Sequence, residues 1–488
     1  MATLHASREI KVLHVSPEAV PFCKVGGLAD VAGSLPPSLR KSGTDCRLLL
    51  PAWDGVLDTA HKRGLKLVRL PRSVDVAIRW KVYNGTLWMS SGEDFPVYFL
   101  ESPFFEKKQI YPQQLDPESV LPFVFLSLAA LELADATEWD ADVLHCHDWG
   151  TAPLISALLW HRYYRFMFSQ YKTVFTIHNL AHQGLLPLHS LRDWGLVDDA
   201  FTLNGLEFYG GANLMKGAIT GASAVTTVSP TYSHEIQTEN GGVGLGGLLR
   251  SQNSKIRGIL NGLDTEYWNP ATDSLLFQNY SPDDLSGKTR CRNALLDRLG
   301  WKEDGRPLFT SVGRMVDQKG FDILLPAIPR MVEWGCRLFL VGSGQREYKT
   351  AIQEAAAKWP DAVASFVGYD EVIAHQAYAA GDFFLMPSKF EPCGLSQLIS
   401  LRYGALPVVR SVGGLADTVF EYGSPEGNGF LFSEYSAEGL LSAVGRSLDV
   451  FGNDAAGYRS VQKKAMRSDF SWDRSAPLYI DLYRSLLS

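Results

Sequence analysis

The hexapeptide Val-Gly-Gly-Leu-Ala-Asp occurs twice in the chain, at Val25–Asp30 and at Val412–Asp417. Each copy follows an apolar run and precedes residues that suit a helix. A Gly-Gly pair between a strand and a helix lets backbone N–H groups approach an anion, and the helix N-terminus adds about half a positive charge. The repeat predicts two anion-handling turns, one in each half of the chain; the alternative is chance recurrence of a turn. Lys24 precedes the first copy, either beside a bound phosphate or solvated on a loop.

Two cations occur in the run Val312–Gly320, at the end of a predicted strand and just before an apolar helix over 321–328. They are Arg314 and Lys319. Two fixed cations beside a diphosphate would stabilise the charge that develops as a glycosyl–phosphate bond breaks. Taken alone, an arginine and a lysine at this spacing are more often surface charges.

The run Ser388–Ser396 follows a predicted strand and opens a helix. Glu391 could hold sugar hydroxyls at this point, or it could complement the helix dipole. Backbone N–H groups from Cys393 to Leu395 are expected to be free at the helix start. The thiol of Cys393 is either a reactive group beside that helix end or an ordinary packing cysteine.

His145 and His147 stand two residues apart at the end of another predicted strand, so their side chains share one face. A metal pair is geometrically possible, but no third ligand accompanies them at a suitable spacing, and we predict no metal. Asp140 and Asp142 precede the same strand, where a solvated turn is the better interpretation. Gly342-Ser343-Gly344 lacks the full Gly-x-Gly-x-x-Gly spacing of a dinucleotide site.

Short apolar, β-branched runs recur along the chain with helical stretches between them. Runs that are apolar on both faces predict parallel sheets buried on both sides, with ligands at the carboxyl ends of the strands. A closing helix is predicted over Ser475–Leu487. The predicted strands are Ile10–Val15, Cys46–Leu50, Val97–Leu100, Val143–Cys146, Thr173–Ile177, Ala224–Val228, Ile256–Leu260, Leu308–Val312, Arg337–Val341, Ala364–Val367, Phe383–Met386, Leu406–Val409 and Phe430–Phe432.

Composition restricts the class of protein. A chain of 488 residues predicts two domains of about 200 to 250 residues each. The net charge of −7 comes without a basic stripe, which argues against a nucleic-acid partner. No apolar segment reaches about 18 residues and the start lacks a signal-peptide core, so neither a membrane span nor export is expected. Six cysteines without a Cys-x-x-Cys pair fit a reducing cytoplasm.

Several motifs together resemble the bacterial glycogen synthases and plant starch synthases, glycosyltransferase family 5. The resemblance runs in order from about residue 10 to residue 472. The motifs are Lys-Val-Gly-Gly-Leu-Ala-Asp-Val, His-Cys-His-Asp-Trp, Thr-Ile-His-Asn-Leu-Ala-His-Gln-Gly, Gly-Ile-Leu-Asn-Gly-Leu-Asp, Gly-Arg-Met-Val-Asp-Gln-Lys-Gly, Phe-Glu-Pro-Cys-Gly-Leu and Ser-Val-Gly-Gly-Leu-Ala-Asp-Thr-Val.

The resemblance implies an α/β GT-B fold, with two Rossmann-like domains facing across a deep cleft. Residues 1–255, with 470–488 crossing back, would form the acceptor-side domain, and 256–469 the nucleotide-sugar domain. The implied reaction moves glucose from ADP-glucose to the non-reducing 4-hydroxyl of an α-1,4-glucan, with retention and without a metal or other cofactor. Oligomeric state is left open.

The family's functional positions map onto this chain by motif. His147, Arg314, Lys319 and Glu391 would be catalytic, with the His147 backbone carbonyl and ring contacting the sugar. The expected donor-binding residues are Lys24, Gly26, Gly27, Asp30, Tyr369, Cys393, Gly394, Leu395 and Ser396. The expected acceptor-side or cleft residues are Glu118, His178, Asn179 and Gln183.

Two positions depart from the family pattern. Where the family commonly has Asp-Asn-x-x-Arg-Phe, this chain has Glu118 followed by Pro122 and Phe123, and proline cannot replace a cation. Gly150 stands where many members carry a polar side chain.

We favour same-face attack as the mechanism, because no sequence feature marks a carboxylate opposite the leaving group. Three alternatives stay open: a GT-B enzyme that uses UDP-glucose or another acceptor, a catalytically silent α-glucan-binding protein, and a nucleotide-dependent oxidoreductase. The last lacks the full glycine fingerprint.

Overall fold

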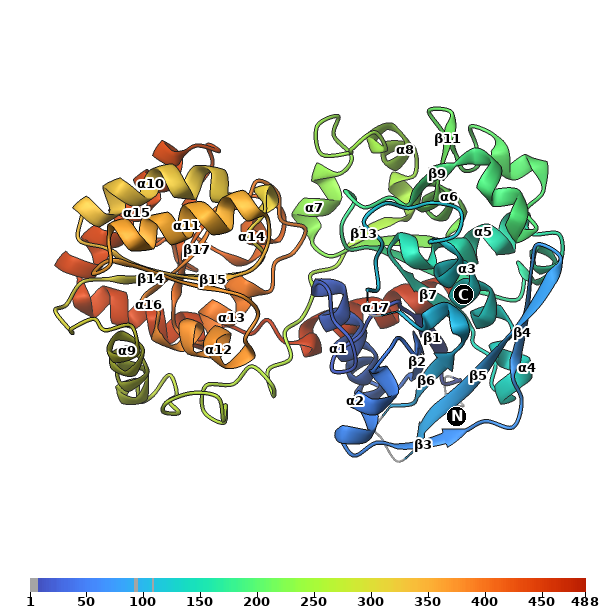
Figure 1. Ribbon diagram of the computed structural model, residues 1–488, viewed down its shortest axis with the longest axis horizontal. Helices are drawn as coiled ribbons and strands as arrows, with labels where there is room; N and C mark the ends of the chain where they lie inside the picture. The colour runs from blue at the N-terminus through green and yellow to red at the C-terminus, as the bar shows by residue number, and fades with distance from the viewer. Residues whose placement is uncertain (1–7, 92–94, 108) are drawn as a thin grey trace, which may run out of the picture. The chain divides into compact units, whose positions relative to one another are not determined.

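The computed structural model describes residues 8–91, 95–107 and 109–488 (Figure 1). The chain divides into two compact units. The first comprises Met1–Gly262 and Trp472–Ser488, and the second comprises Leu263–Ser471.

The first unit is built on a large sheet whose strands run in the order β13-β12-β8-β7-β1-β2-β6-β5-β3. The strands from β13 to β6 pair in parallel, whereas β5 pairs antiparallel with β6, β3 and β4. Their bounds are β1 Lys11–Val15, β2 Asp45–Pro51, β3 Lys66–Arg69, β4 Val74–Ile78, β5 Lys81–Ser91, β6 Val97–Glu101, β7 Val143–His147, β8 Lys172–Ile177, β12 Ala224–Thr227 and β13 Ile256–Gly258. A small antiparallel sheet adds β9 Leu185–Pro187, β10 Glu207–Phe208 and β11 Gly211–Asn213.

The second unit holds a fully parallel sheet in the order β16-β15-β14-β17-β18-β19. Helices α10, α11 and α15 cover one face, and α9, α12 and α13 cover the other (Figure 1). The strands are β14 Leu308–Val312, β15 Arg337–Gly342, β16 Val363–Val367, β17 Phe383–Met386, β18 Leu406–Arg410 and β19 Phe430–Phe432. The helices are α9 Ser286–Arg298, α10 Phe321–Glu333, α11 Arg346–Lys358, α12 Glu371–Ala380, α13 Ser396–Arg402, α14 Gly413–Thr418, α15 Ala437–Asn453 and α16 Ala455–Arg467, with a short 3-10 turn η7 at Asp317–Lys319.

The helices of the first unit include one from the far end of the chain. Helix α17 packs beside α1 on β1, β2, β7 and β8, through side chains such as Tyr479 and Tyr483 (Figure 1). The helices are α1 Gly27–Lys41, α2 Val56–Lys62, α3 Leu121–Leu131, α4 Leu133–Thr137, α5 Ala152–Trp160, α6 Leu214–Gly221, α7 Pro230–Glu235, α8 Gly246–Ser251 and α17 Trp472–Leu487. The 3-10 turns are η1 Pro103–Phe105, η2 Trp149–Thr151, η3 Tyr164–Met167, η4 Leu188–Trp194, η5 Asp198–Phe201 and η6 Asn253–Lys255.

All thirteen predicted strands are present, because runs that are apolar on both faces can be buried only between two helical layers. The antiparallel strands β3, β4 and β5 were not predicted. Strand β4 alternates buried and exposed side chains and so leaves one face toward solvent, whereas the side chains of β3 are mostly exposed.

The division between the units comes after Gly262 rather than after residue 255. Strand β13 pairs with β12, which ties the start of the predicted second domain to the first sheet. Gly262 then passes so close to Trp472 that a Cβ at this position would lie 2.6 Å from the tryptophan. None of the helices in the described ranges is both long enough and apolar enough to cross a membrane.

Candidate functional site

Three of the predicted residues line one small pocket in the second unit. Arg314, Lys319 and Ser396 lie around the carboxyl ends of β14 and β17, with Gly313 and Met386 at the strand ends themselves. The carboxyl edge of a parallel sheet is where α/β proteins bind ligands. The fold therefore brings the two cations and the start of α13 to one place.

Lys319 and Glu391 form an ion pair, with 2.6 Å between Nζ and Oε2. Both side chains are largely covered, and the Ser388 hydroxyl donates to the same Glu391 oxygen at 3.1 Å. A buried carboxylate needs such partners to stay charged. Arg314 is exposed, and its one hydrogen bond to the described residues is a long contact of 3.4 Å to Gln318, so its guanidinium is available to a ligand.

The loop after Glu391 supplies backbone donors. Gly394 has a φ of +79°, and a Cβ at this position would lie 2.3 Å from the Gln397 side chain, so glycine is required. The Gln397 amide donates to the carbonyls of Cys393 and Gly394 and holds the turn. The N–H groups of Gly394 and Leu395 have no hydrogen-bond partner among the described residues. Cys393 is buried, which fits packing better than reactivity.

The second Gly-Gly turn braces this loop through the N–H of Gly414. The Gly414 N–H donates to the Glu391 carbonyl at 3.1 Å. A Cβ on Gly414 would lie 2.2 Å from the Cys393 carbonyl oxygen, so the glycine permits close packing of two backbone segments. The prediction of an anion-handling turn at Val412–Asp417 is therefore wrong for the Gly414 N–H. Tyr369, also predicted at the donor site, is 81% exposed on the loop before α12.

The first Gly-Gly turn already holds an anion from the protein itself. Glu18, which is 2% exposed, accepts hydrogen bonds from the N–H groups of Val25 and Gly26 and from the Tyr111 hydroxyl. Burial raises the pKa of Glu18, while these bonds oppose the shift. Lys24 pairs with Asp30 at 2.7 Å. The N–H of Gly27, at the start of α1, has no hydrogen-bond partner within the described ranges.

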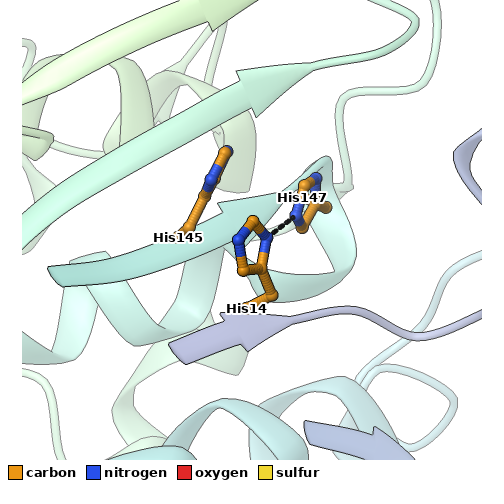
Figure 2. A group of neighbouring side chains, drawn as sticks. All are labelled: His14, His145 and His147. Atoms are coloured by element: carbon orange, nitrogen blue, oxygen red, sulfur yellow. Dashed lines mark hydrogen bonds between the residues drawn. The ribbon is translucent and has the colours of Figure 1, made fainter. Parts of the chain in front are cut away.

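A group of buried histidines lies at the carboxyl ends of β1, β7 and β8 (Figure 2). His14 Nδ1 lies 3.1 Å from His147 Nε2, and His147 Nδ1 lies 3.0 Å from His178 Nε2. His145 bonds the Tyr483 hydroxyl at 2.7 Å and Thr176 at 2.6 Å. Burial lowers the pKa of His147 to about 3 and lowers the pKa values of His14, His145 and His178 as well.

This arrangement corrects two expectations. The His147 ring is fully buried and both of its nitrogens are engaged by histidines, so the ring has no atom left for a sugar. A third potential metal ligand also exists, because nitrogens of His14, His145 and His147 all lie within 4.8 Å of one another. Sequence spacing could not reveal it, since His14 lies 133 positions before His147.

Two of the predicted acceptor-side residues, His178 and Asn179, contact Asp148. Its carboxylate accepts the His178 N–H at 2.7 Å and the Asn179 N–H at 3.4 Å, and burial raises its pKa to about 8. Asp148 also has a φ of +57°, an uncommon conformation for a residue with a side chain. Gln183 is buried, and its amide bonds Leu180, Val243 and Asn213, which makes it a structural brace.

Glu118 has a cationic partner that the sequence did not suggest. Arg79, at the turn between β4 and β5, donates to Glu118 at 2.7 Å and to Asp193 at 3.0 Å. A cation from another element thus lies beside Glu118. Gly150 packs against Phe123, where a Cβ would lie 2.9 Å from that ring.

Comparisons with known proteins extend these observations. Residues 11–251 match the family model of the starch synthase catalytic domain, and residues 306–449 match that of group 1 glycosyl transferases. The chain is 42% identical to a glycogen synthase of Geotalea daltonii over 485 residues, covering 98% of this chain and 99% of the relative. It is 39% identical to a glycogen synthase of Thermotoga maritima over 490 residues, covering 98% and 99%.

A solved structure agrees in fold. The catalytic domain of starch synthase IV from Arabidopsis thaliana, bound to ADP and acarbose, superposes with a TM-score of 0.91 at 36% identity, covering 98% of this chain and 100% of that chain. This likeness confirms the predicted GT-B fold. The extent of these matches shows that the chain belongs to the family of glycogen and starch synthases and is a glycosyltransferase of glycogen or starch synthesis.

Proposed function

We propose that the chain transfers glucose from ADP-glucose to the non-reducing 4-hydroxyl of an α-1,4-glucan, with retention at the anomeric carbon. The observation that carries this proposal is the group formed by Arg314, Lys319 and Glu391 beside the open N–H groups of Gly394 and Leu395. Cations and backbone donors suit a diphosphate, and a fixed carboxylate suits sugar hydroxyls. The ADP in the related starch synthase structure supports the nucleotide, and its acarbose supports a glucan-like acceptor.

Lys319 and Glu391 have linked roles in this proposal. Their ion pair holds the carboxylate toward the donor glucose and keeps the ammonium at the diphosphate. Arg314 then supplies a second positive charge, on an exposed side chain. Ser396, at the first residue of α13, adds a hydroxyl beside the same pocket.

The chemical step is proposed as attack on the face from which ADP leaves. The bond between the anomeric carbon and the diphosphate oxygen breaks, and the acceptor 4-oxygen forms the new glycosidic bond. The acceptor proton passes to the departing phosphate, whose charge Arg314 and Lys319 stabilise. Positioning and electrostatics would supply most of the rate.

The first unit would supply the remaining contacts. We place Gly27, with Lys24, Gly26 and Asp30 around it, near the donor, and Glu118, His178 and Asn179 near the glucan. His147 would act through its backbone carbonyl, which the Thr151 hydroxyl already bonds at 3.0 Å. The described cysteines are all free thiols, which suits a reducing cytoplasm.

The test is release of ADP or UDP from their glucose conjugates, with and without glycogen. Glycogen-dependent ADP release, with glucose added to the polymer, is expected. Release from UDP-glucose alone would show a different donor, and glycogen binding without release would indicate a silent binding protein.

Arg314→Ala tests the assigned role of the cation. We expect kcat to fall about a hundredfold or more, because one charge-stabilising donor in a catalytic site contributes on that order. Glycogen binding should stay nearly unchanged. Arg330→Ala is a matched control, since Arg330 is exposed and contacts its own neighbours Glu333 and Trp334. Turnover close to normal in Arg314→Ala would contradict the role.

A further inference from the structure

Three imidazoles in the first unit form a continuous hydrogen-bonded row. His14 on β1 contacts His147 on β7, and His147 contacts His178, the residue after β8. The two nitrogen–nitrogen distances are 3.1 and 3.0 Å. Figure 2 shows the first of these contacts directly. His145 lies beside the row but bonds to hydroxyl groups instead.

The row can carry its protons in two ways. A neutral imidazole has one N–H donor and one bare acceptor nitrogen. Burial keeps all three rings neutral by lowering their pKa values. Each nitrogen–nitrogen contact needs one hydrogen, so all three rings must be the same tautomer. Either every Nδ1 carries the hydrogen, or every Nε2 does.

The inner end of the row distinguishes the two arrangements. His14 Nε2 is buried and has no partner within the described part of the chain. In one arrangement this atom is an unpaired lone pair, and in the other it is an unpaired N–H. Buried N–H groups without a partner are rarer in proteins than under-used acceptors. The arrangement with hydrogen on every Nδ1 leaves a lone pair, and not an N–H, unpaired at this buried end.

The outer end is the point at which the row reaches solvent. His178 is 8% exposed, whereas His14 and His147 are fully buried. Its Nε2 is taken by His147, and its Nδ1 has no partner in the ranges the structure describes. We propose that the buried row fixes the His178 ring as an Nδ1–H donor, which presents a hydrogen bond to an acceptor oxygen of the glucan.

This inference rests on the proposed function for its ligand but not for its proton arrangement. A glucan hydroxyl can accept a hydrogen bond from an N–H without ionising. A neutral His178 can therefore hold the acceptor sugar while the proton of the attacking 4-hydroxyl passes to the departing diphosphate. In this reading His14 is a positioning residue. It touches no substrate and acts through His147.

The proton arrangement is measured on the free full-length chain. Two-bond proton–nitrogen NMR of protein labelled with ¹⁵N in its histidines distinguishes a protonated ring nitrogen from a bare one. The variants His14→Asn, His178→Asn and His178→Gln assign the signals. Hydrogen on Nδ1 of all three rings is expected. Hydrogen on Nε2 of His178 would overturn the proposal, and so would a metal co-purifying on the nitrogens of His14, His145 and His147.

The donor is tested with a matched pair of amides. Asparagine places an N–H near the position of Nδ1, and glutamine places its amide near Nε2. His178→Gln should keep the bond to His147 but lose the donor, raising KM for glycogen about tenfold. His178→Asn keeps an N–H donor but loses the bond to His147, so it should raise that KM less than His178→Gln does and should also lower thermal stability. KM for ADP-glucose should change little in both.

His189→Gln, at an exposed histidine of the same unit, is the control and should behave as the parent. An equal rise in KM for glycogen in the two His178 variants would overturn the donor role. If the parent chain shows no glycogen-dependent ADP release, the proposed function fails, while the NMR measurement still decides the proton arrangement.

Discussion

At the scale of single residues, buried carboxylates organise the first unit. Glu18 takes the N–H groups of Val25 and Gly26, so the first Gly-Gly turn is held by an internal anion. Asp148 holds the segment that follows β8 in place, because its carboxyl group accepts a hydrogen bond from the N–H of His178. Both carboxyl groups have raised pKa values because burial disfavours their charged forms.

Asp148→Asn should change how stability depends on pH. The folded-state pKa of Asp148 is about 8, above its unfolded value of about 3.9, so the folded chain holds one extra proton between these limits. The free energy of unfolding therefore falls as pH rises through that window, by up to about 1.4 kcal/mol per pH unit. Asparagine can accept the same bonds without titrating. Denaturant unfolding at pH 5 and pH 8 should show this decrease in the parent and a smaller one in the variant.

The same comparison made with Asp142→Asn serves as the control, because Asp142 pairs with Arg8 near the surface. An identical pH dependence in the parent and in Asp148→Asn would contradict the prediction.

At the scale of elements, the hairpin of β4 and β5 brings a cation to the loop before α3. Arg79 adopts a φ of +58° at the hairpin turn and bridges Glu118 and Asp193. Its backbone N–H also donates to the Asp193 carbonyl at 2.7 Å. The hairpin is thus fastened to η4 by both backbone and side chain.

Arg79→Ala should affect glucan use more than stability. The ion pairs are partly exposed, so the free energy of unfolding should fall by less than about 1 kcal/mol. If Glu118 is an acceptor-side residue, loss of its partner should raise KM for glycogen several-fold and leave KM for ADP-glucose unchanged. Arg72→Ala, which breaks a similar exposed pair with Glu138, is the control. Equal glycogen KM values for the two variants would remove Arg79 from the acceptor side.

At the scale of the whole molecule, the chain begins and ends in the same unit. Helix α17 covers the sheet beside α1, and Tyr483 bonds the ring of His145. Trp472 also donates to the Ser34 hydroxyl at 2.7 Å. The second unit lies between two chain crossings at residues 262–263 and 471–472.

Removing residues 472–488 should unfold the first unit and spare the second. The helix buries Trp472, Tyr479, Ile480 and Tyr483, and large buried side chains contribute about 1.5 to 3 kcal/mol each. That sum is comparable to the about 5 to 15 kcal/mol that stabilises a typical protein. Hydrogen exchange should then show fast exchange in β1, β7 and β8 and continued protection in β14–β18. Removal of Leu487 and Ser488 alone should leave both patterns unchanged, and protection of β7 in the longer truncation would contradict the prediction.

The sequence by itself determined the parallel strands, the family and the loop that we propose binds the ligand in the second unit. Runs that are apolar on both faces predict buried strands without knowledge of their partners. The residues near strand or helix ends are placed at one sheet edge by their positions in the sequence; they are Arg314, Lys319, Glu391 and Ser396.

Only the tertiary structure decided the partners of the first unit. His14 meets His147 across 133 positions, and Arg79 meets Glu118 across 39. Glu18 closes the first Gly-Gly turn, and β13 joins the first sheet. No local pattern marks these pairs, because a hydrogen bond depends on where two strands or loops lie in space. Whether a glycine turn holds a ligand or the protein's own carboxylate is therefore decided by packing.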